Sequence, residues 1–337
     1  MPRRILIVAP SWIGDTIMMQ PLLMRLKACE PDAEIHVIAP AWSAPLLARM
    51  PEVAATIENP FAHGKFDWAG RKALGRRLTT ADFSAAFVLP NSWKSALVPF
   101  FAKIPTRTGY TGEARYFLLN DRHTLAEAAM PRLVDRYAAL AGPLDTPTPN
   151  PRLTSTPGQQ RAARAALGLP FDVTPVVFCP GAEYGPAKRW PAAHFAALAQ
   201  KVSRGGTPLN GPIWCIGSTK DAEVGAEIER LSEGAARNLC GRTNLEQAID
   251  LIADARAVVS NDSGLMHVAA ALDRPLAALY GSSSPAYTPP LSPRAKIVSL
   301  DLECSPCFKR ECPLGHLNCL NQLQPEQVLA ALAHDDA

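Results

Sequence analysis

The sequence lacks several signatures that would place it in a common class of protein. No apolar run reaches the roughly 18 residues that a membrane-spanning helix needs. Neither G-x-G-x-x-G nor G-x-x-x-x-G-K-[ST] occurs, so a dinucleotide fingerprint and a P-loop are both missing, and an NAD-dependent oxidoreductase is disfavoured. The net charge of +3 is too small to indicate nucleic-acid binding, and we expect no nucleic-acid partner.

The composition is that of an ordinary globular protein with room for two domains. The chain has 337 residues, of which 47% are hydrophobic and 19% are charged. Its first residues, MPRRILIVAPSWIGD, resemble a signal peptide, but the apolar stretch is short and Pro10 and Asp15 follow it closely. A buried strand fits better. We therefore expect a reducing, cytoplasmic location.

Short apolar runs alternate with amphipathic stretches, which predicts parallel sheets with crossover helices. The expected strands are 4–9, 34–39, 83–89, 175–179, 212–216, 257–260 and 276–279. The expected helices are 16–29, 44–50, 131–141, 159–167, 194–202, 222–231, 245–253, 264–271 and 324–332. Two α/β halves of nearly equal size suggest a ligand cleft between domains.

A proline-rich stretch separates the two halves. Residues 143–157 contain five prolines in 15 residues, a density that neither a helix nor a central strand tolerates. We treat this stretch as the linker, with a possible edge strand at Arg152–Leu153. The expected domains are residues 1–157 and 158–337. The last helix packs either on the second domain or back on the first.

The first candidate functional loop is PSWIGD, which follows the first expected strand. It lies at the carboxyl end of that strand, where open α/β sheets place their ligand sites. Asp15 is the candidate functional side chain. Its alternative role, or that of Ser11, is simply to cap the following helix.

The second half supplies three further loops that follow expected strands. NDSGLMH places Asp262, Ser263 and Gly264 at a helix N-terminus, which suits a diphosphate, although the same residues are strong helix caps. His267 lies one turn further on and is by default a core histidine. PGAEYGPAKRWP offers Lys188 as a cation for phosphate, or else an ordinary exposed basic loop. IGSTKD carries small polar residues and is a weak candidate by itself.

These motifs together resemble the ADP-heptose:lipopolysaccharide heptosyltransferases. The resemblance rests on PSWIGD, PGAEYGPAKRWP and NDSGLMHVAAAL, which occur in the family's order along most of the chain. It implies a GT-B type α/β fold, with two Rossmann-like domains whose parallel sheets face each other across a cleft. The first domain is then the acceptor-binding domain and the second the nucleotide-sugar domain.

The resemblance also implies an inverting transfer of L-glycero-D-manno-heptose from ADP-heptose to the first heptose of the lipopolysaccharide inner core, heptosyl-Kdo2-lipid A. Asp15 corresponds to the family's catalytic base. The donor diphosphate and sugar are assigned to Lys188, Asp262, Ser263, Gly264 and His267, and the nucleotide to Ser218, Asp221 and Thr243. Without an Asp-x-Asp motif, no metal clamp on the leaving group and no cofactor is expected. The alternatives are another core heptosyltransferase or a GT-B sugar-nucleotide epimerase or hydrolase.

An excess of basic residues in the first half offers a surface for an anionic acceptor. Residues 61–136 hold 12 Lys and Arg against 6 Asp and Glu. A solvated surface is the alternative explanation. The candidate acceptor-binding residues are Arg71, Lys72, Arg76, Arg77, Arg107, Arg115 and Arg122. Peripheral contact with the cytoplasmic face of the inner membrane is expected.

Eight cysteines divide into two groups. Cys29, Cys179, Cys215 and Cys240 lie in apolar surroundings and are expected in the core. Cys304, Cys307, Cys312 and Cys319, with His316 nearby, are not required by the resemblance. They are either reduced thiols in a Pro- and Gly-rich loop or ligands of a structural metal ion, and we commit to no metal.

Overall fold

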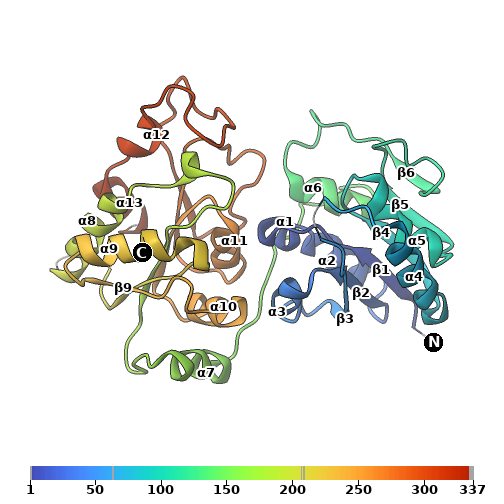
Figure 1. The fold of residues 1–337 in the computed structure, drawn as a ribbon, viewed down its shortest axis with the longest axis horizontal. Coiled ribbons are helices and arrows are strands. Elements are labelled where there is room, and N and C mark those ends of the chain that lie inside the picture. Colours follow the sequence, from blue (N-terminus) through green and yellow to red (C-terminus); the bar gives the residue numbers. More distant parts are fainter. Residues whose placement is uncertain (1, 63, 206, 208, 334–337) are drawn as a thin grey trace. The chain divides into compact units, whose positions relative to one another are not determined.

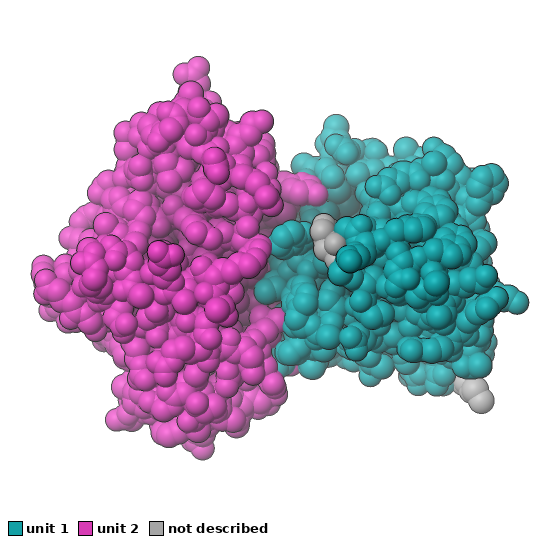
Figure 2. All heavy atoms as spheres, in the orientation of Figure 1, with its two compact units in different colours: residues 1–151 teal, residues 152–337 magenta. Residues whose placement is uncertain are grey.

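A computed structural model describes residues 2–62, 64–205, 207 and 209–333 of the chain. The chain divides into two compact units, Met1–Pro151 and Arg152–Ala337 (Figure 2). The division falls before the expected boundary at residue 157, within the proline-rich stretch. Pro157 itself is the first residue of a helix. Thr156 caps that helix in a reciprocal capping box with Gln159.

Unit 1 contains one parallel sheet with strand order β3-β2-β1-β4-β5-β6 (Figure 1). Its strands are β1 (Arg4–Val8), β2 (Glu34–Ala39), β3 (Val53–Glu58), β4 (Phe83–Val88), β5 (Thr106–Tyr110) and β6 (Asp121–His123). Its helices are α1 (Ile13–Met18), α2 (Gln20–Cys29), α3 (Ala44–Leu47), α4 (Trp68–Leu78), α5 (Leu97–Phe101) and α6 (Leu133–Ala138). Short 3-10 turns are η1 (Ala41–Ser43), η2 (Thr79–Ala81), η3 (Trp93–Ala96) and η4 (Ala139–Ala141).

Unit 2 repeats this architecture with the parallel order β12-β11-β10-β7-β8-β9. Its strands are β7 (Val176–Cys179), β8 (Ile213–Cys215), β9 (Ala236–Asn238), β10 (Ala257–Asn261), β11 (Leu276–Leu279) and β12 (Ala295–Val298). Its helices are α7 (Pro157–Leu167), α8 (Ala192–Ser203), α9 (Ala222–Leu231), α10 (Leu245–Ala253), α11 (Gly264–Ala271), α12 (Asn318–Asn321) and α13 (Pro325–Ala333), with 3-10 turns η5 (Pro186–Lys188) and η6 (Thr219–Asp221).

Counted within each unit, both sheets have the strand order 3-2-1-4-5-6 of Rossmann folds. In such an order, connections leave the two central strands in opposite directions, which opens a crevice at their carboxyl ends. The central pairs are β1 with β4 and β7 with β10. The prediction of two Rossmann-like α/β halves is confirmed.

Two local expectations were wrong. The helix expected over 16–29 is broken at Met19 into α1 and α2, because Pro21 has no N–H to donate to a carbonyl one turn earlier. The edge strand expected at Arg152–Leu153 does not form. The Leu153 amide instead donates to the Ala271 carbonyl at 2.9 Å.

One core cluster of unit 2 joins one face of the sheet to the last helix. Val328 and Leu332 of α13 pack with Phe195 of α8 and with Leu279 of β11 in one buried cluster. The last helix therefore packs on its own unit. No helix in the part of the chain that the structure describes is long and apolar enough to cross a membrane.

Candidate functional site

The crevice at the carboxyl ends of β7 and β10 brings two predicted site residues together. Lys188 is the last residue of η5 in the loop after β7, and Asp262 directly follows β10. Their side chains form an ion pair in which Lys188 Nζ lies 2.5 Å from Asp262 Oδ2. The Asp262 side chain is buried, and that of Lys188 is 18% exposed. An ammonium group is thus held at the crevice, where a phosphate would find it.

Two further side chains fix this pair. The Ser283 hydroxyl donates to Asp262 Oδ2 at 2.5 Å, so this oxygen accepts from both Lys188 and Ser283. The Tyr184 ring lies 5.3 Å from Lys188 Nζ, which is within cation–π range. Sequence reasoning missed Ser283. Its one signal was GSSS after the strand LAALY, a run of small polar residues at a strand's carboxyl end.

Asn261 builds the loop that carries Lys188. Its side chain is fully buried, donates to the Pro180 carbonyl at 2.7 Å and accepts from the Trp190 amide at 3.0 Å. Both ends of the loop from Pro180 to Trp190 are therefore tied to the end of β10. Asn261 belonged to the quoted motif, but its part in the site was not predicted.

The N-terminus of α11 lies beside the ion pair. Ser263 is its N-cap and Gly264 its first residue, and both are partly exposed. The Ser263 side chain makes no capping hydrogen bond, so the capping alternative is wrong for this residue. A hydrogen bond joins the Ser260 and Ser263 hydroxyls at 3.3 Å instead. Amides that are not capped by this side chain, together with the helix dipole, favour an anion here.

His267 is buried one helical turn into α11, as expected of a core histidine. Burial lowers the pKa of its imidazole to about 4; the nearby Lys188 charge lowers it too, and Asp262 opposes both. The ring is therefore neutral at physiological pH. A neutral imidazole can donate or accept a hydrogen bond without adding charge to the site.

The predicted nucleotide-binding residues lie after the next strands of the same sheet. Ser218 is exposed at the N-cap of η6, and Thr243 is half-buried before α10. Asp221 is buried, and its Oδ2 accepts from the Ser218 amide at 2.9 Å and from the Ser218 hydroxyl at 2.7 Å. Asp221 thus shapes its own loop.

Asp15 lies in the first turn of α1, which follows β1. Trp12 is the N-cap and makes no side-chain capping hydrogen bond, and Asp15 is the third residue of the helix. The capping alternative is therefore wrong in assigning the N-cap position to Asp15 or Ser11. Asp15 is partly exposed.

Three of the predicted acceptor-binding arginines hold loops within unit 1, which corrects their assignment. Arg115 is 1% exposed and donates to the carbonyls of Tyr110 and Pro90 at 2.6 Å each. Burial lowers its pKa to about 10. Arg71 is buried over the Phe61 ring, and its guanidinium donates to backbone carbonyls. Arg107 donates to the Leu118 and Ile104 carbonyls.

The remaining basic candidates are more exposed but scattered. Arg76 and Arg77 lie at the end of α4, shortly before β4 begins, and hence at the amino edge of the sheet, opposite the edge of Asp15. That position argues against contact with a substrate at Asp15. Lys72 is half-buried, and Arg122 is exposed above the Tyr116 ring. The seven candidate residues therefore do not form one acceptor surface.

The cysteines separate as partly expected. Cys179, Cys215 and Cys240 are buried, and burial raises the pKa of the Cys240 thiol to about 12. Cys29, however, is exposed at the end of α2, so its expected place in the core is wrong. In the described ranges, no three His, Cys, Asp or Glu side chains are placed so that they could hold a metal ion as they stand.

Comparisons of the sequence with known proteins agree on one family. The model of the family "Glycosyltransferase family 9 (heptosyltransferase)" matches residues 71–318. Lipopolysaccharide heptosyltransferase 2 of Salmonella typhimurium is 46% identical over 98% of this chain and 97% of that protein. The Escherichia coli K12 protein of the same name is 45% identical over the same shares.

A solved structure agrees with these relatives. The structure of E. coli ADP-heptose lps heptosyltransferase II superimposes with a TM-score of 0.86 at 43% identity, covering 99% of this chain and 100% of that one. The GT-B fold that the motifs implied is thereby confirmed, and the chain belongs to glycosyltransferase family 9, the heptosyltransferases.

Proposed function

We propose that this protein transfers L-glycero-D-manno-heptose from ADP-heptose to the first heptose of heptosyl-Kdo2-lipid A. The observation that carries the proposal is the Lys188–Asp262 pair beside the α11 N-terminus, at the β7/β10 crevice of a family 9 chain. A cation and helix amides suit a diphosphate, and a carboxylate suits sugar hydroxyls.

In the donor site, Lys188 and the amides of Ser263 and Gly264 bind the diphosphate. Asp262 and the neutral His267 face the heptose and hydrogen-bond its hydroxyls. Ser218 and Thr243 lie toward the nucleoside, and Asp221 holds the Ser218 loop in shape. Tyr184, Asn261 and Ser283 position Lys188 and Asp262.

Asp15 serves as the general base. It takes the proton of the acceptor hydroxyl as the oxygen forms a bond to the anomeric carbon of the heptose. The bond from that carbon to the diphosphate oxygen breaks on the opposite side, so the configuration inverts and ADP departs with the electron pair. Lys188 and the α11 amides stabilise the growing negative charge. Each contribution is typically worth about 10²-fold or more in rate.

The acceptor is assigned to unit 1, where aromatic rings gather near the carboxyl edge of the sheet. Trp93, which follows β4, stacks on Phe66 and Trp68 with ring centroids 5.9 Å and 6.0 Å away. Phe66 is 48% exposed. Since β4 neighbours β1, this cluster lies on the edge that bears Asp15. Aromatic faces suit sugar rings and acyl chains, and Lys72 and Arg122 remain as cations for acceptor phosphates.

Because the proposed acceptor is a lipid, we infer a cytoplasmic protein that contacts the inner-membrane face peripherally. The exposed aromatic rings of Phe66 and Trp68 support such contact because aromatic side chains favour the membrane interface. The net charge of +3 gives no reason to add a nucleic-acid partner.

A transfer assay with matched acceptors tests the proposal. The full-length protein is incubated with ADP-heptose and either heptosyl-Kdo2-lipid A or Kdo2-lipid A, and the product linkage is identified. We expect transfer only to the acceptor that already carries a heptose. Transfer to Kdo2-lipid A instead would indicate a different core heptosyltransferase. Loss of the sugar at the same rate without acceptor would indicate a hydrolase or epimerase.

A further inference from the structure

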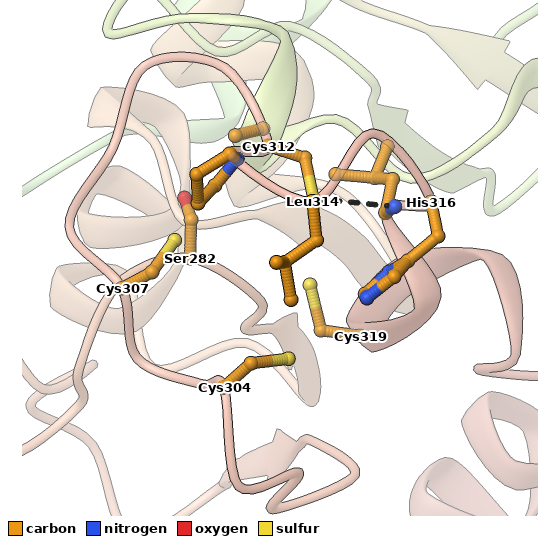
Figure 3. Close-up of a pocket in the computed structure, with 10 residues that line it drawn as sticks. Ser282, Cys304, Cys307, Cys312, Leu314, His316 and Cys319 are labelled. Carbon is orange, nitrogen blue, oxygen red and sulfur yellow. Dashed lines mark hydrogen bonds between the residues drawn. The ribbon is translucent and has the colours of Figure 1, made fainter.

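The four C-terminal cysteines, which the proposed reaction does not use, line one small cavity. Cys304, Cys307 and Cys312 come from the described segment between β12 and α12, which contains no helix or strand, and Cys319 is the second residue of α12. They surround a space of about 20 Å³ together with Ser282, Leu314 and His316 (Figure 3). A segment with little regular structure has therefore brought four thiols together.

A second observation concerns a buried hydroxyl that lines this cavity. Ser282 is 1% exposed and lines this cavity, and its hydroxyl has no hydrogen-bond partner among the described residues. Buried hydroxyls usually have a hydrogen-bond partner in native proteins, because an unpaired one is destabilising. A thiolate bound to a cation would accept this hydrogen bond.

The turn after Cys312 has the form of a thiolate ligand loop. The Leu317 amide donates to Cys312 Sγ at 3.4 Å (dashed line in Figure 3), across a turn in which Gly315 has φ of +72°. Amide donors stabilise a negatively charged sulfur. Gly315 permits this backbone conformation.

His316 is not arranged as a ligand. Its Nδ1 accepts a hydrogen bond from the Asn318 amide at 3.0 Å. In the neutral ring the proton then resides on Nε2, which leaves neither nitrogen with a free lone pair. The available ligand set is therefore the four thiols.

We propose that Cys304, Cys307, Cys312 and Cys319 bind one thiophilic divalent cation of the zinc class as a structural tetrathiolate site. Each thiol loses its proton to solvent as its sulfur bonds the cation, and no oxidation or reduction takes place. The thiols as they stand do not meet at coordinating positions. Binding thus requires the four sulfurs to move until each lies about 2.3 Å from the cation.

The site would support the donor loop rather than the chemistry. The Ala187 amide donates to the Arg310 carbonyl at 3.0 Å, and the Tyr184 hydroxyl donates to the Phe308 carbonyl at 2.9 Å. The Phe308 amide donates in turn to the Ser282 carbonyl at 2.7 Å. The cysteine segment therefore hydrogen-bonds to the loop that carries Lys188. These contacts do not depend on which nucleotide sugar the loop binds.

Metal analysis of the full-length protein tests the site independently of any transfer activity. The protein is purified under reducing conditions without chelators, and its metal content is measured by inductively coupled plasma mass spectrometry. We expect one equivalent of zinc per chain. Cobalt added to the metal-free protein should give the intense sulfur-to-cobalt charge-transfer absorption of a tetrathiolate site.

Two variants and one control complete the test. Cys304→Ser and Cys312→Ser should lose the bound metal, whereas Cys29→Ser, at an exposed thiol of unit 1, should keep it. The cobalt spectrum of the wild-type protein decides the question even if a variant fails to fold. Fully reduced wild-type protein that holds no zinc and shows no cobalt charge-transfer band would overturn the proposal, as would full metal content in a folded Cys304→Ser variant.

Discussion

Replacing Lys188 by Met removes the only cation that the structure places on Asp262 within the described residues, and its effect can be worked out in advance. The side-chain volume is nearly kept, so the change is chiefly one of charge. If Lys188 binds the donor diphosphate, the lost charge-assisted hydrogen bond is worth about 1.5–3 kcal/mol, which raises the Kd for ADP about 10- to 150-fold.

Stability should fall as well, because Asp262 is buried and loses its counter-ion. Breaking a buried ion pair costs about 3–5 kcal/mol. The Lys188 side chain is 18% exposed and Ser283 still donates to Asp262, so we expect about 2 kcal/mol here. The double variant Lys188→Met/Asp262→Asn removes the unpaired carboxylate, and it should regain most of this stability without regaining ADP affinity.

Isothermal titration calorimetry with ADP and chemical denaturation measure the two effects separately. Lys201→Met is the matched control, since Lys201 forms an exposed pair with Glu326 on α8 and α13. The control should change neither ADP affinity nor stability measurably. Wild-type ADP affinity in Lys188→Met would refute the diphosphate role, and so would full recovery of affinity in the double variant.

Two further substitutions test residues whose environments the structure defines. The lowered pKa of His267, about 4 against 6.5, means that the unfolded chain takes up a proton that the folded one does not. The free energy of unfolding should therefore fall by up to about 3 kcal/mol as pH falls from 6.5 toward 4. Denaturation of His267→Gln over this pH range should show a smaller fall. An unchanged dependence on pH would contradict the burial argument. Arg115→Met should destabilise unit 1 by about 3 kcal/mol or more, because several carbonyls lose their donor. In the same denaturation experiments, Arg122→Met at the surface should cost less than about 0.5 kcal/mol. Equal effects would contradict the assignment of Arg115 to the core.

Much of the fold could be predicted because its central strands are apolar. β1 and β10 are buried on both faces and read as β-branched runs, which is typical of parallel sheets. β5 (TRTGY) and β9 (ARN) were missed since they are short and polar, and only their neighbours in the sheet give them strand structure. The break between α1 and α2 was signalled by Pro21 and overlooked.

The site was predictable loop by loop but not as an arrangement. Lys188 and Asp262 were each selected as the polar residue after an apolar strand, yet 74 residues separate them, and their pairing depends on the sheet order. The charge count failed for Arg115 and Arg71 because composition does not show whether a guanidinium faces solvent or backbone carbonyls. Ser283 could not be ranked above its neighbours for the same reason.

The turnover of Asp15→Asn measures the general-base role most directly. This isosteric change keeps hydrogen bonding but removes the basic carboxylate, so kcat for transfer to heptosyl-Kdo2-lipid A should fall about 10²- to 10⁴-fold. The Kd for ADP should stay at its wild-type value, and Asp32→Asn, at an exposed position after α2, should leave both quantities unchanged. A kcat for Asp15→Asn equal to that of the wild-type protein would contradict the assignment of Asp15 as the base.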